Sequence, residues 1–255
     1  MPTIRANDLE IHYLDQGAGT PVVLVHGNWA TSSWWEPVLE RLPPGLRAIA
    51  PDLRGRGRTA GGANDHRIAT YASDLLALAD ALGLERFALV GHSLGSAVAM
   101  EFALTWPERL TSLVVVSPAW IDGMPESYAV EAYQRRLKDD IAFMDAALRA
   151  IVPGAPKDER WDRLVREGNA QSLEAALGLI PALLEWKPGD RVGAIAMPRV
   201  VISGALDLFT GGPNAERVAT ALGCELITIE CVGHGPMLEA PDRFCEILWG
   251  RVTPS

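Results

Sequence analysis

The stretch that decides the fold is 86-RFALVGHSLGSAVAMEFALTWP-107, in which an apolar run passes through a serine between two glycines into small and apolar residues. Residues 86–93 are typical of a strand that is buried on both faces of a parallel sheet. Residues 94–107 predict a helix that ends before Pro107. A strand followed directly by a helix, here with a sharp turn at Ser93, is the repeating unit of an α/β fold.

Short apolar runs of the same kind recur along most of the chain. They lie at residues 10–17, 21–27, 46–53, 110–119, 198–207 and 224–231. Helical segments lie between several of them, at 70–84 and 213–223, and the second of these opens with proline and closes with glycine. This alternation predicts an α/β fold with a mostly parallel, doubly wound sheet and helices on both faces.

The region from residue 120 to residue 190 departs from this alternation, because it contains no convincing strand. It reads as amphipathic helices instead, for example 126–151 and 172–186. We predict a helical cap at residues 120–190, inserted ahead of the strand that carries the candidate acid, with residues 1–119 and 191–255 forming the α/β core. Such an insertion would lie over the carboxyl ends of the strands, where α/β sheets bind ligands.

The strongest chemical signal is Gly91-His92-Ser93-Leu94-Gly95, which fits the pattern G-x-S-x-G between a strand and a helix. This context predicts a nucleophile elbow, a strained turn that lifts the serine hydroxyl above the sheet. Glycines suit the turn because the backbone there comes close to both strand and helix. The helix start also points N–H groups at the reacting oxygen. Ser93 is therefore the candidate nucleophile.

A serine hydroxyl needs a base to take its proton, and histidine suits that role because its pKa is about 6.5. His234 lies in 233-GHGPMLEAP-241, just after the last predicted strand. Asp207 ends the preceding predicted strand and is the candidate acid that orients the base. The order Ser93, Asp207, His234 is the one expected of a hydrolase with this elbow. Asp122, one strand earlier, is the alternative acid.

The stretch 26-HGNW-29 directly follows another apolar run and is the candidate oxyanion loop. An oxyanion hole needs two N–H donors. We expect these to be the backbone N–H groups of Leu94 and Asn28, since the Asn28 side chain could serve only to shape the turn. Eight apolar side chains are the candidate substrate contacts: Trp29, Trp120, Met124, Trp161, Trp186, Leu208, Phe209 and Met237.

Composition excludes several other classes of protein. The net charge is −9, and the arginines of 54-RGRGR-58 are interpreted as a solvated or salt-bridged loop, so no nucleic-acid partner is expected. No secretory signal and no apolar run of membrane-spanning length appear, which favours a cytoplasmic protein that does not bind membranes. Cys224, Cys231 and Cys245 are interpreted as buried free thiols, and no His, Cys and carboxylate cluster has metal-ligand spacing.

Taken together, these motifs resemble the α/β-hydrolase superfamily, in its esterase, lactonase and perhydrolase branch. The matching stretches are HGNW, 51-PDLRGRGRT-59, GHSLG, the strand with Asp207, and GHGPMLEAP; Thr59 and Ser96 are small departures. The resemblance implies a cofactor-free enzyme that uses a covalent acyl intermediate. We expect a monomer or homodimer that cleaves an ester or lactone of a small, largely apolar molecule, since the aromatic and methionine side chains named above favour an apolar pocket. Perhydrolysis, carbon–carbon hydrolysis of a diketone, and a small-ligand receptor remain as alternatives. Dehalogenase and epoxide-hydrolase chemistry is disfavoured, because it needs a carboxylate where Ser93 stands.

Overall fold

The computed structural model describes residues 2–62 and 64–252. The predicted limits of the core at residues 1 and 255 lie outside this described part. The strands are β1 (Thr3–Ala6), β2 (Leu9–Gly17), β3 (Thr20–Val25), β4 (Leu46–Pro51), β5 (Ala60–Gly61), β6 (Phe87–Ser93), β7 (Leu110–Pro118), β8 (Arg199–Gly204) and β9 (Glu225–Ile229).

In the described chain these strands form one nine-stranded sheet, in the order β1-β2-β4-β3-β6-β7-β8-β9, with β5 paired to β2. β2 runs antiparallel to its neighbours β1, β4 and β5. All pairs from β4 through β9 are parallel. The prediction of a mostly parallel sheet is therefore confirmed.

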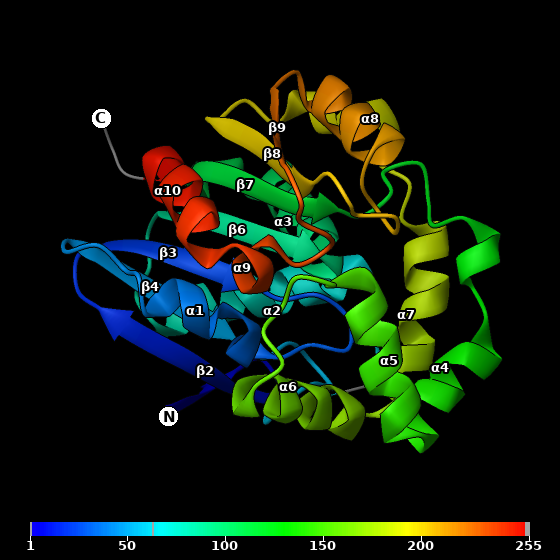
Figure 1. The fold of residues 1–255 in the computed structure, drawn as a ribbon. Coiled ribbons are helices and arrows are strands. Elements are labelled where there is room, and N and C mark those ends of the chain that lie inside the picture. The colour runs from blue at the N-terminus through cyan, green and yellow to red at the C-terminus, as the bar shows by residue number, and fades with distance from the viewer. Residues whose placement is uncertain (1, 63, 253–255) are drawn as a thin grey trace.

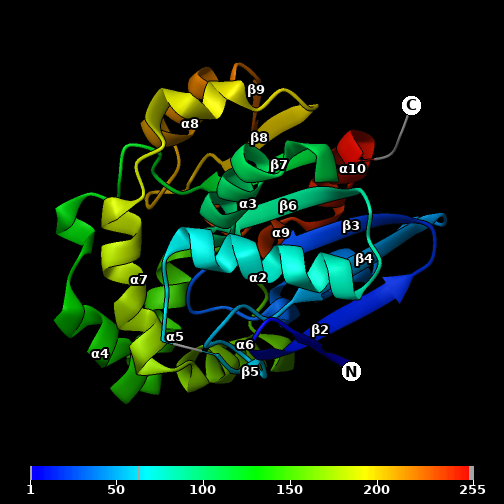
Figure 2. The same ribbon diagram turned by 180° about the vertical axis from the view of Figure 1, so that it is seen from behind.

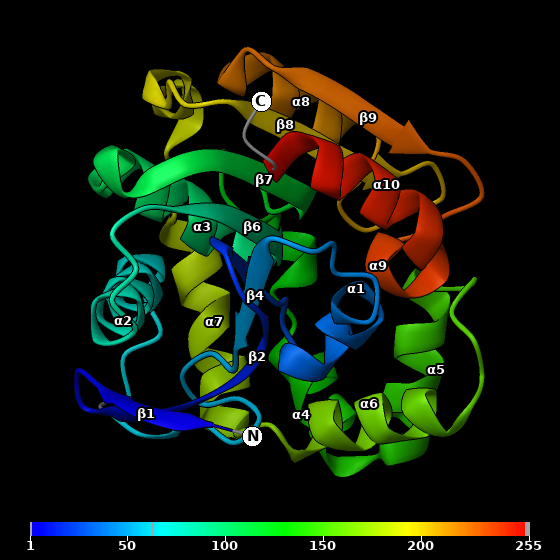
Figure 3. The same cartoon turned by 90° about the vertical axis from the view of Figure 1, so that its left-hand side faces the viewer.

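Helices cover both faces of this sheet (Figures 1, 2 and 3). On one face lie α2 (Ile68–Ala81), α3 (Leu94–Thr105) and α8 (Pro213–Leu222), and on the other lie α1 (Glu36–Leu39) and α10 (Pro241–Val252). The short helix α9 (Pro236–Glu239) precedes α10. None of the helices in the described chain is long and apolar enough to span a membrane.

Each central strand contributes to two hydrophobic cores, because successive side chains of a strand point to opposite faces. In β3, Val23 and Val25 pack in the core under α2 and α3, whereas Val22 and Leu24 pack in the core under α1 and α10. All four side chains are fully buried. The continuous apolar run of this strand is thus explained by burial on both faces.

Between β7 and β8, residues 119–198 form helices joined by turns and loops, without a strand. The helices are η3 (Glu126–Tyr128), α4 (Glu131–Asp139), α5 (Ile141–Ile151), α6 (Glu159–Ala170), α7 (Leu173–Glu185) and η4 (Gly189–Ala194). The helix predicted over 126–151 is wrong as one element, because Asp140 leaves the helical conformation at φ −130° and ψ 98° and caps α5 by accepting a hydrogen bond from the Phe143 N–H. Figure 1 shows α4 to α7 grouped at one end of the sheet. We call residues 120–190 the cap.

The cysteine interpretation is correct only in part. Cys245 is buried, Cys224 is half-buried and Cys231 is exposed. Cys231 lies in the turn just after β9, where its φ is +61°. It is therefore exposed in a turn and is not part of the hydrophobic core.

Candidate active site

Ser93 lies at the junction of β6 and α3, in a backbone conformation that few residues other than glycine adopt, with φ +54° and ψ −119°. Two glycines make this turn possible. A Cβ atom on Gly91 would collide with the carbonyl oxygen of Gly95, and one on Gly95 would collide with those of Val25 and His26. The G-x-S-x-G spacing therefore lets α3 start directly against β3 and β6.

This close approach gives a stability prediction. Gly95→Ala should lower the free energy of unfolding by roughly 1–3 kcal/mol or more, the scale of an overpacked core. Gly250→Ala is the matched control, because the Cβ added there, within α10, meets no atom within 4 Å. That variant should keep or gain up to about 1 kcal/mol from helix propensity. Urea denaturation measures both, and equal stability of the two variants would contradict the packing described here.

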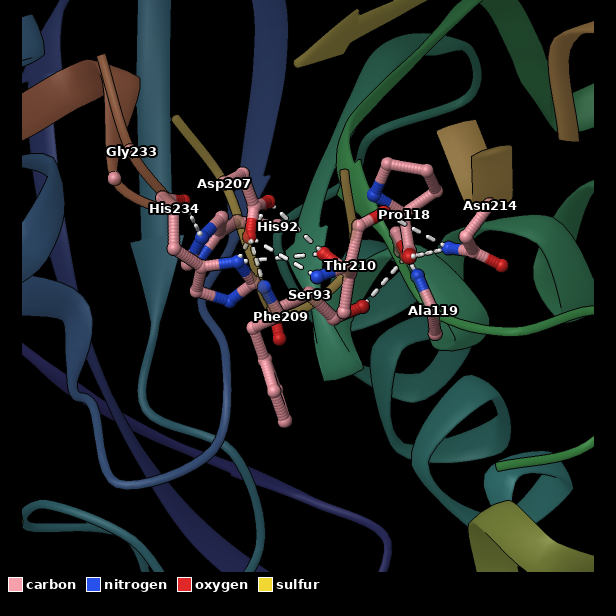
Figure 4. Close-up of polar contacts among 12 residues, drawn as sticks. His92, Ser93, Pro118, Ala119, Asp207, Phe209, Thr210, Asn214, Gly233 and His234 are labelled. Carbon is pink, nitrogen blue, oxygen red and sulfur yellow. Dashed lines mark hydrogen bonds and ion pairs between the residues drawn. The ribbon is translucent and has the colours of Figure 1, made fainter. Parts of the chain in front are cut away.

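Asp207 and His234 form a buried pair at the ends of neighbouring strands. Asp207 follows β8, His234 follows β9, and Oδ2 of Asp207 lies 3.0 Å from Nδ1 of His234 (Figure 4). The Asp207 carboxylate also accepts the N–H groups of Phe209 and Thr210, each at 3.0 Å, and the Thr210 hydroxyl at 3.1 Å. Figure 4 shows Ser93 in the same group of side chains.

Burial on its own would raise the pKa of Asp207, but the attraction of His234 and the hydrogen bonds from His234, Thr210 and Phe209 together hold it well below its ordinary value. Asp207 is therefore a carboxylate at neutral pH. A carboxylate can only accept a hydrogen bond, so Nδ1 of His234 carries the proton and, in the neutral ring, Nε2 is unprotonated. The pair thus presents a base whose orientation and tautomer are fixed.

His92, inside the elbow, contacts His234 through a hydrogen bond and through its ring. Its Nε2–H donates to the backbone carbonyl of His234 at 2.8 Å, and the two rings lie 4.8 Å apart between centroids. The His92 ring also stacks on Trp34, with ring centroids 5.7 Å apart. Burial, and then the proximity of His234, lower the pKa of His92 to about 3, so this ring stays neutral. His92 therefore adds packing next to the candidate base without adding charge.

Three buried histidines give a prediction for stability against pH. Burial lowers the pKa of His26 and of His66 to about 4 and that of His92 to about 3, whereas the ordinary value is 6.5. Below pH 6.5 the unfolded chain binds protons that the folded chain does not, so stability is complete above that pH and is lost as the pH falls toward 4. Each histidine contributes a slope on the order of 1 kcal/mol per pH unit.

Urea denaturation between pH 7.5 and 5 checks this slope. A free energy of unfolding that stays constant over this range would mean that these histidines take up protons in the folded protein.

The alternative acid, Asp122, lies on the surface. Its carboxylate pairs with Arg217 at 2.9 and 3.0 Å, and its side chain is 58% exposed. In the described chain no hydrogen bond joins it to His234, whereas Asp207 contacts that ring directly. The geometry therefore favours Asp207.

The two expected oxyanion donors, Asn28 and Leu94, lie next to Ser93 and line the same cavity. Leu94 is the first residue of α3, so its N–H belongs to the unpaired helix start. Neither N–H donates to another described residue, whereas the N–H of Trp29 is already bonded to Gln171 at 3.1 Å. The Asn28 side chain accepts hydrogen bonds from elsewhere, which agrees with a role for its backbone rather than its amide.

A cavity of about 420 Å³ lies between the carboxyl ends of the strands and the cap. Ser93 and His234 line it, together with Trp29, Trp120, Met124 and Phe209 of the predicted substrate contacts. Among its lining residues none is an aspartate, glutamate, lysine or arginine. Its wall is therefore largely apolar and contains no acidic side chain, lysine or arginine.

Two predicted contacts in the cap, Trp161 and Trp186, are wrong. Both are buried and lie outside the cavity lining. Trp161 lies in α6 and its indole N–H donates to Asp145 of α5 at 2.5 Å, while that of Trp186 donates to Glu101 of α3 at 3.0 Å. These tryptophans fasten cap helices to their neighbours instead of facing substrate.

Two predicted contacts in the core, Leu208 and Met237, are wrong as well. Leu208 is 93% exposed on the loop after β8 and points away from the cavity, whereas its neighbour Phe209 faces His234 with ring centroids 5.3 Å apart. Met237 is fully buried in α9 and packs in the hydrophobic core beneath the sheet.

Several lining residues were missed by the sequence analysis. They are Trp34, Tyr128, Tyr133, Gln134, Leu137, Leu148, Leu179, Leu183 and Thr210, among others. Thr210 had a readable signal, since a hydroxyl three residues after the candidate acid can bond its carboxylate. The cap residues had none, because amphipathicity reports a buried face without naming what covers it.

The comparisons with known proteins agree with this geometry. The family model described as "Alpha/beta hydrolase family" matches residues 22–247. The chain belongs to the alpha/beta hydrolase family. The alpha/beta hydrolase fold and the superfamily resemblance predicted from the motifs are thereby confirmed, and the chain is a hydrolase of this family.

Individual relatives carry different names. A Rhizobium rhizogenes protein named "Putative carbamate hydrolase RutD" is 29% identical over 247 residues, which cover 92% of this chain and 93% of the relative. A solved thermophilic esterase from Thermogutta terrifontis aligns with a TM-score of 0.86 at 23% identity, covering 98% of this chain and 97% of that one. A solved N-acyl homoserine lactone degrading enzyme aligns at 0.79 and 27% identity, covering 98% and 100%.

Proposed function

We propose that this alpha/beta hydrolase is a cofactor-free serine hydrolase that cleaves a carboxylic ester or lactone of a small, largely apolar substrate. The observation that carries the proposal is the Asp207–His234 pair, 3.0 Å between Oδ2 and Nδ1, beside a cavity that Ser93 also lines. Ser93 is the nucleophile, His234 the base, and Asp207 the acid that orients the base. The N–H groups of Asn28 and Leu94 bind the oxyanion.

The reaction proceeds in two acyl transfers. Ser93 Oγ attacks the ester carbon, its proton passes to Nε2 of His234, and the carbonyl electron pair moves onto the oxygen between the two N–H donors. When that pair returns, the carbon–oxygen bond to the leaving alcohol breaks and the alcohol takes the proton from His234. Water then gives a proton to His234 and attacks the acyl carbon. When this second intermediate collapses, the bond between that carbon and Ser93 Oγ breaks, Oγ takes the proton back from His234, and the acid is released.

The substrate class follows from the cavity wall. A largely apolar lining without lysine or arginine offers no cationic partner for an ionised acyl group, and desolvating such a group there would be costly. A neutral acyl chain that fills part of the 420 Å³ space gains free energy from burial instead. The names of the esterase and lactone-degrading neighbours support this class, and the carbamate hydrolase name makes a neutral carbamate a necessary comparison.

A panel of p-nitrophenyl acetate, butyrate, hexanoate and succinate, one N-acyl homoserine lactone and one aryl carbamate tests the proposal. We expect multiple turnovers, with kcat/KM rising from acetate to hexanoate by about tenfold or more, since each buried methylene contributes about 0.8 kcal/mol. Succinate should be the poorest ester.

The same panel, repeated with hydrogen peroxide as a competing acceptor and extended by a 1,3-diketone, separates the alternatives. A single turnover, or none, would favour a small-ligand receptor. Faster transfer to peroxide than to water would favour a perhydrolase, and cleavage of a 1,3-diketone without ester turnover would favour a carbon–carbon hydrolase.

A further inference from the structure

The backbone of the candidate oxyanion loop is held in an unfavourable conformation. Trp29 directly follows Asn28 and has a φ of +53°, the left-handed region that a bulky aromatic residue rarely occupies. Such a conformation persists only where surrounding contacts fix it. The position of the Asn28 N–H group therefore depends on what holds these two residues in place.

The cap provides one of those contacts through Gln171, which lies between α6 and α7. Its Oε1 accepts the backbone N–H of Trp29 at 3.1 Å, and its Nε2 donates to Oδ1 of Asn28 at 3.2 Å. The residue is only 3% exposed, so water does not compete for either bond. Gln171 is not among the residues that line the cavity, and it therefore acts on the loop rather than on substrate.

The core provides the opposing contact through Arg56, from the stretch expected to be a solvated or salt-bridged loop. The expectation is wrong for this side chain, which is 1% exposed. Its Nη2 donates to Oδ1 of Asn28 at 3.0 Å, and its Nη1 donates to the Tyr71 hydroxyl at 2.6 Å. The Asn28 amide oxygen thus accepts one hydrogen bond from the core and one from the cap.

A second part of the cap packs against the same loop. Gly168, near the end of α6, lies so close to Trp29 that a Cβ atom on it would be 2.5 Å from the Trp29 carbonyl oxygen. The N–H of Trp29 bonds to Gln171, and the C=O of Trp29 abuts Gly168. Both ends of this residue's backbone therefore face the junction of α6 and α7.

From these contacts we propose that Gln171 is a positioning residue that holds the Asn28 N–H where the oxyanion forms, so that the docked cap completes the catalytic site. The inference rests on the proposed ester-hydrolase function. Its consequence is that the cap contributes to transition-state stabilisation as well as to the apolar wall.

Gln171→Met tests the proposal, because methionine has nearly the same length and makes neither hydrogen bond. Removing an oxyanion donor costs about 10²–10³ in kcat, and misplacing one should cost less, so we expect kcat on the best ester of the panel to fall about 10- to 100-fold. The affinity for a trifluoromethyl ketone, whose serine adduct carries the oxyanion, should fall by a similar factor. KM, and the affinity for a non-hydrolysable ether analogue of the ester, should change less than about threefold, since neither the ester nor the ether carries negative charge on oxygen.

Asn169→Leu is the matched control. The Asn169 amide donates to the carbonyls of Leu137 and Lys138 within the cap, at 2.8 and 2.9 Å, and has no bond to residues 28 and 29. Asn169→Leu, like Gln171→Met, replaces an amide by an apolar side chain and removes two hydrogen bonds, but these lie within the cap. We therefore expect kcat and ketone affinity to stay within about threefold. If Gln171→Met does not fold by circular dichroism, Gln171→Glu replaces it; that variant retains the acceptor for Trp29 and loses the donor to Asn28.

The outcomes separate the two proposals. Unchanged kcat and ketone affinity in the folded Gln171 variant would overturn the positioning role, as would an equal loss of affinity for the ketone and the ether analogue, or an equal loss in Asn169→Leu. Absence of ester turnover in the unmodified enzyme would overturn the proposed function instead.

Discussion

Ser93→Ala is expected to abolish ester turnover, with kcat reduced on the order of 10⁶-fold, the scale measured for loss of the nucleophile in other serine hydrolases. Alanine removes the only atom that attacks the carbonyl and leaves the elbow backbone and its glycines as they are. Steady-state kinetics with a p-nitrophenyl ester and circular dichroism of the variant check both statements.

Ser112→Ala is the matched control for this variant. Ser112 is another buried serine, in β7, and its hydroxyl has no partner among the described residues. Its removal should leave kcat within a few-fold. More than about 1% residual activity in Ser93→Ala, which is far from the expected loss, would show that another group attacks the substrate.

Asp207→Asn is expected to lower kcat by about 10³- to 10⁴-fold, the scale of losing a triad acid. The carboxylate accepts hydrogen bonds from His234, Phe209 and Thr210, whereas an amide has one acceptor oxygen and brings a donor group of its own. The imidazole then loses the partner that fixes its tautomer and stabilises its charged form. KM should change far less than kcat.

Asp122→Asn is the control, because that carboxylate pairs with Arg217 on the surface. Its rate should stay within a few-fold of the unmodified enzyme. If Asp122→Asn were the more damaging of the two substitutions, the acid would have to be assigned to the end of β7.

The parts of the candidate site that the sequence could predict are those that strand ends and turns position. Ser93 requires a strand, a helix and glycines on both sides, and each of these is readable over a few residues. Asp207 and His234 follow neighbouring parallel strands, whose carboxyl ends meet at one edge of the sheet. Local patterns therefore predict that these side chains lie close together, and no knowledge of the whole fold is needed.

The cavity wall could not be predicted in the same way. Leu208 and Phe209 are adjacent and both apolar, yet one is exposed and the other faces His234, because the turn after Asp207 sets their directions. Trp161 and Trp186 lie on buried helix faces, but periodicity does not say whether such a face covers substrate or another helix.

Gln171 and Arg56 illustrate long-range contacts that no local pattern encodes. They reach Asn28 from residues 143 and 28 positions away in the chain. Only the packed arrangement of cap on core reveals that they share one acceptor.

The most direct test of the central claim is mass-spectrometric mapping of the protein after reaction with a neutral alkyl fluorophosphonate, which phosphonylates an activated serine and releases fluoride. We expect one adduct per chain, located on Ser93, with ester turnover lost in proportion to labelling and no adduct in Ser93→Ala. Full ester turnover in an enzyme labelled at Ser93, or inactivation by an adduct on any other residue, would contradict the assignment of Ser93 as the nucleophile.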